Sequence, residues 1–130
     1  MSPHRFDVRV YYEDTDFSGN VYHSAYLHFF ERGRTEFLRS IGVHHSELIK
    51  SGIAFAVRSM QIEFLRAAHI DDMLLVETAV ERVTPARLLL VQRIVRDGLA
   101  ITEAKVLIVA INTNGKPARM PKAILARLGG

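Results

Sequence analysis

One amphipathic segment stands out in a chain whose other patterned segments are typical of strands. Between Ser24 and Ile41, apolar side chains return every three or four positions, which predicts a helix of about five turns. Gly33 lies within this apolar stripe. Because a glycine inside a helix costs about 1 kcal/mol relative to alanine, its place there predicts close packing against another backbone. We expect the stripe to form the core around which the rest of the chain folds. Its members are Tyr26, Phe29, Phe30, Gly33, Phe37 and Ile41.

The residues at both ends of this helix indicate where it begins and stops. Ser24 is the expected N-cap, because a serine hydroxyl can accept a hydrogen bond from a free N–H of the first turn. Gly42 is the expected C-cap glycine. A short helical turn is predicted over residues 44–52, and Pro121 is expected to open another short helix.

The segments outside the helix alternate as strands do. Strands are predicted over residues 6–12, 53–64, 73–83, 87–96 and 99–112, and the apolar second half of the last one predicts burial on both faces. A phase slip near Arg58 and Ser59 predicts a β-bulge, and Asp97–Gly98 is a tight hairpin signal. The loops between the later strands are too short for parallel crossovers. The order therefore predicts a single α+β domain over residues 1–130, with a mainly antiparallel sheet of about five strands and one helix laid on it.

Composition removes several classes of function. The chain has no cysteine, which excludes a disulfide framework, a thiolate metal site and a cysteine nucleophile. Its net charge of +3 is mild and its basic residues are scattered, so nucleic acid is not an expected partner. The longest apolar run, VLIVAI, is far short of the roughly 20 residues that span a bilayer. The N-terminal segment lacks the apolar core of a signal peptide. We therefore expect a cytoplasmic protein without a membrane span.

Three acidic residues lie within four positions ahead of the helix, and residue patterns alone leave their role open. The stretch from Asp14 to Gly19 matches the first positions of a calcium-binding loop, but Ala25 stands where a bidentate glutamate is required. His23 and His28 are five positions apart and do not share one helical face, so a transition-metal site is not expected either. A turn that caps the helix and a catalytic carboxylate both fit the pattern.

The stretch YYEDTDFSGNVYHSAYLHFFERGRTEFL, residues 11–38, closely resembles the signature of hotdog-fold acyl-CoA thioesterases. The resemblance is to the 4-hydroxybenzoyl-CoA thioesterase type, and most closely to the Tol–Pal-associated acyl-CoA thioesterases. It continues in FAVRSMQIEFLRAAHIDD, in LVQRIV and in the terminal MPK, and so covers nearly the whole chain. It implies a hotdog fold, in which a sheet wraps around one long helix, and an acyl-CoA thioester hydrolase that needs no cofactor and no metal.

The resemblance also assigns roles to residues ahead of the helix. Asp16 matches the catalytic carboxylate, which either attacks the thioester carbonyl or activates a water that does so. The position of His23 matches a backbone N–H that polarises the carbonyl oxygen, and we expect its side chain to orient water or shuttle a proton as well. Gly19 is expected to let backbone approach the substrate closely, and Tyr22 is assigned to substrate binding with it.

Other acidic residues are expected to be structural. Asp14 is predicted to make a structural hydrogen bond. Glu31 and Glu36 are rivals for the catalytic role, because a separate hotdog branch places its carboxylate on the helix. Helical spacing favours ion pairs for both instead. Glu31 is expected to pair with Arg34, and Glu36 with Arg32.

The chain departs from the usual family pattern at two places. Where relatives often have Ala-Gly-Gly, it has the stretch Phe17–Asn20, and the bulky Phe17 is expected to reshape the pocket mouth. Ala67 or Ala68 stands where a proline is usual, which is expected to change a turn more than the chemistry.

Substrate and partners follow from the same resemblance. Acyl-CoA is the expected substrate. Its acyl group is left open, with Phe17, Phe55 and Phe64 as candidates for lining the pocket. A homodimer or homotetramer with the acyl site between two subunits is expected, and acyl carrier protein is an alternative partner. The alternative functions are a hotdog hydratase or dehydratase, and a non-catalytic acyl-binding or scaffold protein. The basic residues considered for the CoA phosphates are Arg87, Arg93, Arg96, Lys105, Lys116, Arg119 and Lys122.

Overall fold

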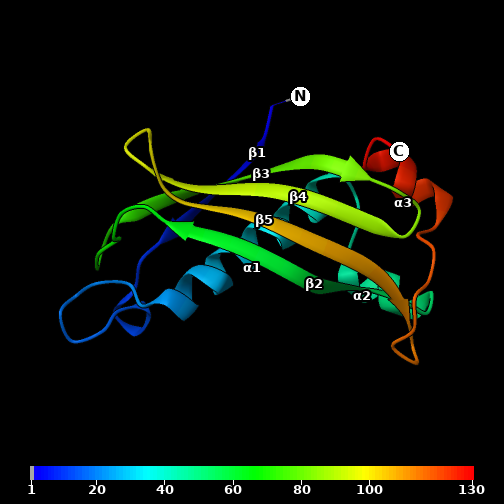
Figure 1. Ribbon diagram of the computed structural model, residues 1–130, viewed down its shortest axis with the longest axis horizontal. Coiled ribbons are helices and arrows are strands. Elements are labelled where there is room, and N and C mark those ends of the chain that lie inside the picture. Colours follow the sequence, from blue (N-terminus) through cyan, green and yellow to red (C-terminus); the bar gives the residue numbers. More distant parts are fainter. Residues whose placement is uncertain (1) are drawn as a thin grey trace.

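A curved antiparallel sheet wraps around one long helix in the computed structural model, which describes residues 2–130 (Figure 1). This confirms the predicted α+β arrangement. The helices are α1 (His23–Ser40), α2 (His45–Lys50) and α3 (Lys122–Arg127), with a 3-10 turn at Tyr12–Asp14. The strands are β1 (His4–Arg9), β2 (Ile53–Phe64), β3 (Met73–Val83), β4 (Arg87–Arg96) and β5 (Leu99–Asn112). Within this range no helix is long and apolar enough to cross a membrane.

The strand order of the sheet is β1-β3-β4-β5-β2, and each neighbouring pair is antiparallel. Asp97 and Gly98 join β4 to β5 with φ angles of +53° and +79°, which are the angles a type I′ hairpin requires. The register of β2 against β5 shifts between Val57 and Ser59, so the predicted bulge is confirmed. The order leaves β1 and β2 as the two edge strands of the described sheet.

The aromatic face of α1 fills the space under the sheet. Phe29 and Phe30 are fully buried, and Tyr26 and Phe37 are nearly so. The predicted close packing at Gly33 is confirmed, because a Cβ added there would lie 2.5 Å from Cγ1 of Val76. The neighbour is, however, a side chain of β3 and not the backbone that the sequence suggested. Gly33 thus lets β3 lie close against the helix.

The predicted helix start was one residue late, and its predicted cap was wrong. Tyr22 is the N-cap residue, in extended conformation, and it makes no side-chain capping hydrogen bond. Its carbonyl accepts the N–H of Ala25 at 3.0 Å, so the helix already begins at His23 and Ser24 is an exposed residue of the first turn. At the other end Ile41 is the C-cap residue. Gly42 follows it with φ +81° and donates its N–H to the carbonyl of Arg39, so this glycine ends the helix as predicted.

Two strand predictions also need correction. β1 ends at Arg9, three residues earlier than expected, because the carboxylate of Asp14 accepts the N–H of Tyr11 at 2.9 Å and helps turn the chain into a 3-10 turn. In β5 only one face is fully buried. Val106 and Ile108 lie against the helix side, whereas the alternate residues Leu107, Val109 and Ile111 remain half-buried on the other face.

Candidate active site

The acidic stretch forms a tight loop between the 3-10 turn and α1. The N–H of Asp16 donates to the carbonyl of Asn20 at 2.9 Å, and the N–H of Gly19 donates to the carbonyl of Asp16 at 3.0 Å. Thr15 and Val21 close the loop as an isolated β-bridge. Gly19 has φ +85°, a conformation that residues with a side chain rarely adopt. The turn itself therefore requires this glycine.

The carboxylate of Asp16 lies on the outside of this loop. Its Oδ1 accepts the N–H of Ser18 at 2.8 Å and the hydroxyl of Ser18 at 2.5 Å. The hydroxyl and then the N–H of Ser18 hold the pKa of Asp16 below its ordinary value, so the group is ionised at neutral pH. Its Oδ2 accepts no hydrogen bond from any residue in the 2–130 range. One oxygen of a fixed, charged carboxylate is thus free to act on a ligand.

Asp14 has a structural role, as predicted. Its Oδ2 accepts the N–H of Tyr11 at 2.9 Å, and its carbonyl accepts the N–H of Tyr22 at 3.2 Å. These bonds tie the 3-10 turn to the start of the helix. No group of three His, Asp or Glu side chains in the described residues is arranged to hold a metal ion.

The start of α1 adds free N–H groups beside the loop. In residues 2–130 the backbone N–H groups of His23 and Ser24 have no backbone acceptor, as is usual for a first helical turn. The imidazole of His23 is exposed and lies against the ring of Phe64, with centroids 4.4 Å apart. The hydroxyl of Tyr22 donates to the carbonyl of Glu13 at 2.9 Å, which fixes its ring beside the loop. Tyr22 and His23 therefore follow in the chain directly after the loop that carries Asp16 and Gly19.

The loop is held in place by a second loop, residues 65–72, between β2 and β3. The N–H of Val21 donates to the carbonyl of Ala68 at 2.9 Å, and the N–H of Ile70 donates to the carbonyl of Gly19 at 3.0 Å. Asn20 and His69 form a β-bridge between the two loops. The shape of the acidic loop therefore depends on a segment some 50 residues further along the chain.

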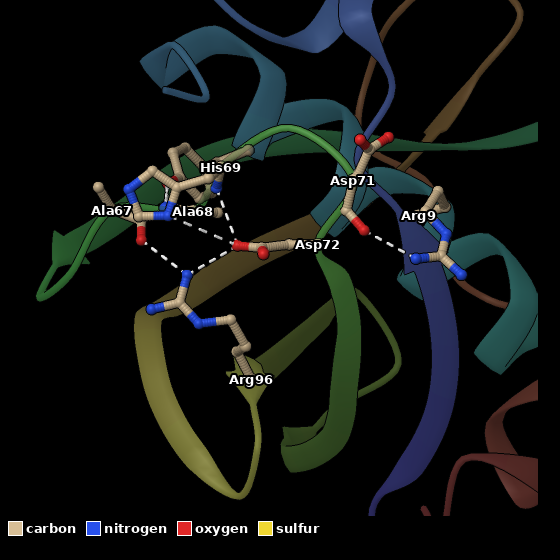
Figure 2. A network of polar contacts seen from close by, with 8 residues as sticks. Arg9, Ala67, Ala68, His69, Asp71, Asp72 and Arg96 are labelled. Carbon is tan, nitrogen blue, oxygen red and sulfur yellow. Dashed lines mark hydrogen bonds and ion pairs between the residues drawn. The ribbon is translucent and has the colours of Figure 1, made fainter. Parts of the chain in front are cut away.

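Polar contacts in turn fix this second loop (Figure 2). The carboxylate of Asp72 accepts the N–H of His69 at 2.9 Å and the guanidinium of Arg96 at 2.8 Å. Arg96 also donates to the carbonyl of Ala67 at 2.9 Å, and Arg9 donates to the carbonyl of Asp71 at 2.7 Å. Partial burial pushes the pKa of Asp72 upward, but the His69 N–H and the Arg96 guanidinium outweigh it and lower the pKa overall.

Tyr26 connects α1 to the second loop. The fully buried N–H of Ala68 donates to the hydroxyl oxygen of Tyr26 at 2.9 Å. A proline at position 68, one of the two places where relatives were expected to carry it, would have no N–H to offer. The alanine at this position thus gives the loop a contact with the helix that the sequence did not predict.

Several predicted contacts do not form in the described residues. The expected pairs of Glu31 with Arg34 and of Glu36 with Arg32 are absent there. Glu36 pairs with Arg39 at 3.5 Å, because both side chains lie on the outer face one turn apart. Arg34 turns inward instead and donates to Gln92 at 3.1 Å.

The aromatic residues considered for the acyl pocket lie in different places, and some of the basic residues considered for CoA are already paired. Phe17 is fully exposed, Phe64 contacts His23, and Phe55 lines a cavity of about 400 Å³ between α1, α2 and β2. Three of the basic residues considered for CoA are engaged in ion pairs: Arg93 with Glu77, Arg96 with Asp72, and Lys105 with Glu81.

Comparison with known proteins identifies the family. A model of the thioesterase-like superfamily matches residues 10–128. The chain belongs to this superfamily. The acyl-CoA thioesterase YbgC of Haemophilus influenzae is 44% identical over 93% of this chain and 90% of that protein. The acyl-CoA thioester hydrolase YbgC of Escherichia coli O6:H1 is 42% identical over 94% of this chain and 92% of that protein.

A solved structure agrees with these relatives. The crystal structure of a probable thioesterase from Bartonella henselae has a TM-score of 0.87 and 46% identity, and the match covers 92% of this chain and 100% of that one. The predicted membership and the hotdog fold of this thioesterase-like chain are confirmed. The roles assigned to Asp16, Gly19, Tyr22 and His23 stay predictions, which the local geometry makes testable.

Two tyrosines of this thioesterase-like chain provide a matched test of how the loops are held. Tyr26→Phe leaves the buried N–H of Ala68 without its partner and should lower the free energy of unfolding by about 1–3 kcal/mol. Tyr22→Phe removes an exposed hydrogen bond, whose carbonyl partner can bind water instead. Its free energy of unfolding should therefore stay within about 0.5 kcal/mol of that of the parent. Urea titration of both variants measures the difference. Equal losses would show that the Tyr26 hydroxyl does not support the second loop.

Proposed function

We propose that this chain hydrolyses acyl-CoA thioesters, with Asp16 as the carboxylate that carries the reaction. The observation behind the proposal is the position of Asp16. An ionised carboxylate with one free oxygen stands on a rigid loop that leads directly into the free N–H groups of α1. The activity named for the two YbgC relatives supports the same reaction. A thioester suits a carboxylate placed beside free N–H groups, because its carbonyl carbon accepts a nucleophile and its carbonyl oxygen gains negative charge.

The reaction has two routes that use the same atoms. As a general base, Asp16 takes a proton from water, and the water oxygen bonds to the carbonyl carbon. As a nucleophile, Asp16 bonds to that carbon itself and forms an anhydride, which water then cleaves. In both routes the carbon–sulfur bond breaks, CoA leaves as a thiolate that takes up a proton, and the acid is released.

The start of α1 stabilises the charge that develops on the thioester oxygen. The N–H of His23 is unpaired within the described chain and lies at the positive end of the helix dipole. One preorganised donor of this kind is worth roughly 100- to 1,000-fold in rate. The side chain of His23 orients the attacking water or moves a proton. Gly19 and the ring of Tyr22 form the adjacent substrate surface.

A second copy of the chain completes the acyl site. Asp16 is exposed, and it lines none of five well-formed cavities in residues 2–130. β2 is a 12-residue edge strand that carries exposed Val57 and Phe64, whereas the other edge strand has six residues. An open apolar edge of this length favours pairing with another strand. Antiparallel pairing of two β2 strands sets the Phe64 end of one copy beside the Ile53 end of the other.

The first test removes the charge of Asp16. Asp16→Asn keeps the size of the side chain and an oxygen that can accept from Ser18, but it makes a poor base and a poor nucleophile. Turnover measured as thiol release from acyl-CoA should fall by roughly 100- to 10,000-fold. The chain contributes no background in this assay, because it has no cysteine. Urea titration should show a stable fold.

Asp14→Asn is the matched control, since it changes a carboxylate in the same loop whose partner is the backbone N–H of Tyr11. Asparagine can accept that bond, so turnover should stay near that of the parent. A stable Asp16→Asn protein with parental turnover would remove Asp16 from the mechanism and return attention to Glu31 and Glu36. A parent that binds acyl-CoA without cleaving it would favour the acyl-binding alternative.

The second test separates the two roles of His23. His23→Ala should lower turnover by about 100-fold or more if the imidazole handles a proton. His23→Phe keeps an aromatic ring against Phe64 but has no titratable nitrogen, so it should lower turnover as much. If His23→Phe is as active as the parent, the side chain serves only for packing and the backbone N–H is the functional group.

The third test concerns assembly. Light scattering of the parent chain at micromolar concentration should give at least twice the mass of one chain, because an isolated chain leaves the β2 edge and the Asp16 surface open. A folded, stable monomer at that concentration would contradict the shared site. Acyl carrier protein as a partner and a cytoplasmic location stay predictions from the sequence.

A further inference from the structure

The cavity between α1, α2 and β2 has mixed walls. It holds about 400 Å³ and is lined mainly by apolar side chains. These are Leu38, Ile49, Ala54, Phe55, Ala56, Val57 and Ile108. Four polar residues interrupt the apolar wall: Glu31, Arg34 and Thr35 from α1, and His45 from α2. Such a volume fits a small ligand or a short acyl chain, and polar groups in an apolar pocket select among ligands.

Arg34 is the unusual member of this wall. It is only 9% exposed, which is rare for arginine without a carboxylate partner. Its Nη1 donates to Oε1 of Gln92 at 3.1 Å, and the amide nitrogen of Gln92 donates to the carbonyl of Phe30 and to the hydroxyl of Thr78. This buried network fixes the guanidinium. Its other N–H groups find no acceptor in residues 2–130, and the side chain lines the cavity.

The surrounding charges leave Arg34 open to a ligand. Glu31 lies close enough to raise the pKa of Arg34, against the larger lowering by burial, but forms no ion pair with it in the described chain. Burial and the nearby Arg39 lower the pKa of His45, so this imidazole is neutral at neutral pH. The cavity thus presents a fixed guanidinium with unused donors, a neutral imidazole and a hydroxyl.

The place of the cavity connects it to the proposed reaction. Arg34 is eleven residues after His23, so it lies about 16 Å along the helix from the Asp16 end of its own chain. Residues 54–57 of β2 line the cavity, and Phe64 at the other end of β2 contacts His23. Antiparallel pairing of β2 with a second copy brings the cavity of one chain to the His23 end of the other.

We propose that this cavity receives the acyl group and that Arg34 selects acyl groups that carry an oxygen acceptor away from the thioester, such as a terminal hydroxyl or carboxylate. The inference rests on the proposed thioesterase function. An acceptor at the right depth satisfies the free donors of Arg34, whereas a methyl end leaves them buried and unpaired. The apolar wall holds the carbon chain between that acceptor and the thioester.

The test uses acyl-CoAs of equal length with different ends. Methyl-ended, ω-hydroxy and ω-carboxy acyl-CoAs of four to eight carbons are compared by kcat/KM. At one chain length at least, an oxygen-bearing ester should exceed its methyl-ended match by about 10- to 100-fold, as expected for a hydrogen bond to a charged group. The hydroxy and carboxy arms show whether a neutral or an anionic acceptor is preferred. Equal kcat/KM values across all ends would overturn the inference.

Variants locate the preference. Arg34→Lys keeps the charge but loses the planar fork, and should reduce the ratio between oxygen-bearing and methyl-ended esters to within about threefold. Arg32→Lys, an exposed arginine on the same helix, should leave the ratio unchanged. If Arg34→Lys does not fold, Ala54→Leu tests whether the cavity holds the acyl group. It fills the cavity without touching the Gln92 network, and should slow the six- to eight-carbon esters at least tenfold while sparing acetyl-CoA. If neither variant has an effect, the cavity is not the acyl site.

The two proposals fail in different ways. If no CoA ester is cleaved, the proposed function is wrong, and the selectivity of the cavity is then judged by calorimetric binding of the same ester pairs to the parent chain. Tighter binding of the oxygen-bearing esters, lost in Arg34→Lys, supports the cavity. If esters are cleaved without regard to the end group, the function stands and the role of Arg34 is wrong.

Discussion

The burial of one face of α1 under the curved sheet is the constraint on which the rest of the structure depends. Phe29 and Phe30 are removed from solvent, and Gly33 lets β3 approach the helix. Burying a large side chain of this kind stabilises a fold by roughly 1.5–3 kcal/mol. With its axis fixed by these contacts, the helix presents its free N–H groups to the Asp16 loop at one end and carries Arg34 into a cavity toward the other.

Much of the fold was predictable because its signals are local. The bounds of β3, β4 and β5 match the predicted ranges residue for residue, since alternation and the Asp97–Gly98 turn both lie within a few positions of the strand ends. The bulge in β2 followed from a phase slip in the same way. The predicted N-cap, Ser24, was wrong because of another local contact. Serine fits a cap well, but the conformation of Tyr22 and its bond to Ala25 had already started the helix.

The candidate site was predictable only in part, and what was missed depends on distant partners. Asp16 and His23 came from a resemblance over a long motif. Nothing near Arg34 in the sequence points to Gln92, which is 58 positions away, so helical spacing suggested an ion pair with Glu31 instead. The contact between Tyr26 and Ala68 was missed for the same reason. Contacts between residues so far apart in the sequence form only in the folded chain, where the strands are paired in register.

The bonds that shape the acidic loop also set an order of events during synthesis. β1 pairs with β3 across some 70 residues, from His4 opposite Thr78 to Arg9 opposite Met73, and the loop itself rests on residues 68–70. The residues proposed for catalysis leave the ribosome early, yet their supports, including Arg96, emerge much later. Closing such long loops is slow compared with forming a helix. The nascent chain therefore cannot assemble the surface proposed for catalysis until the residues up to Arg96 have been made.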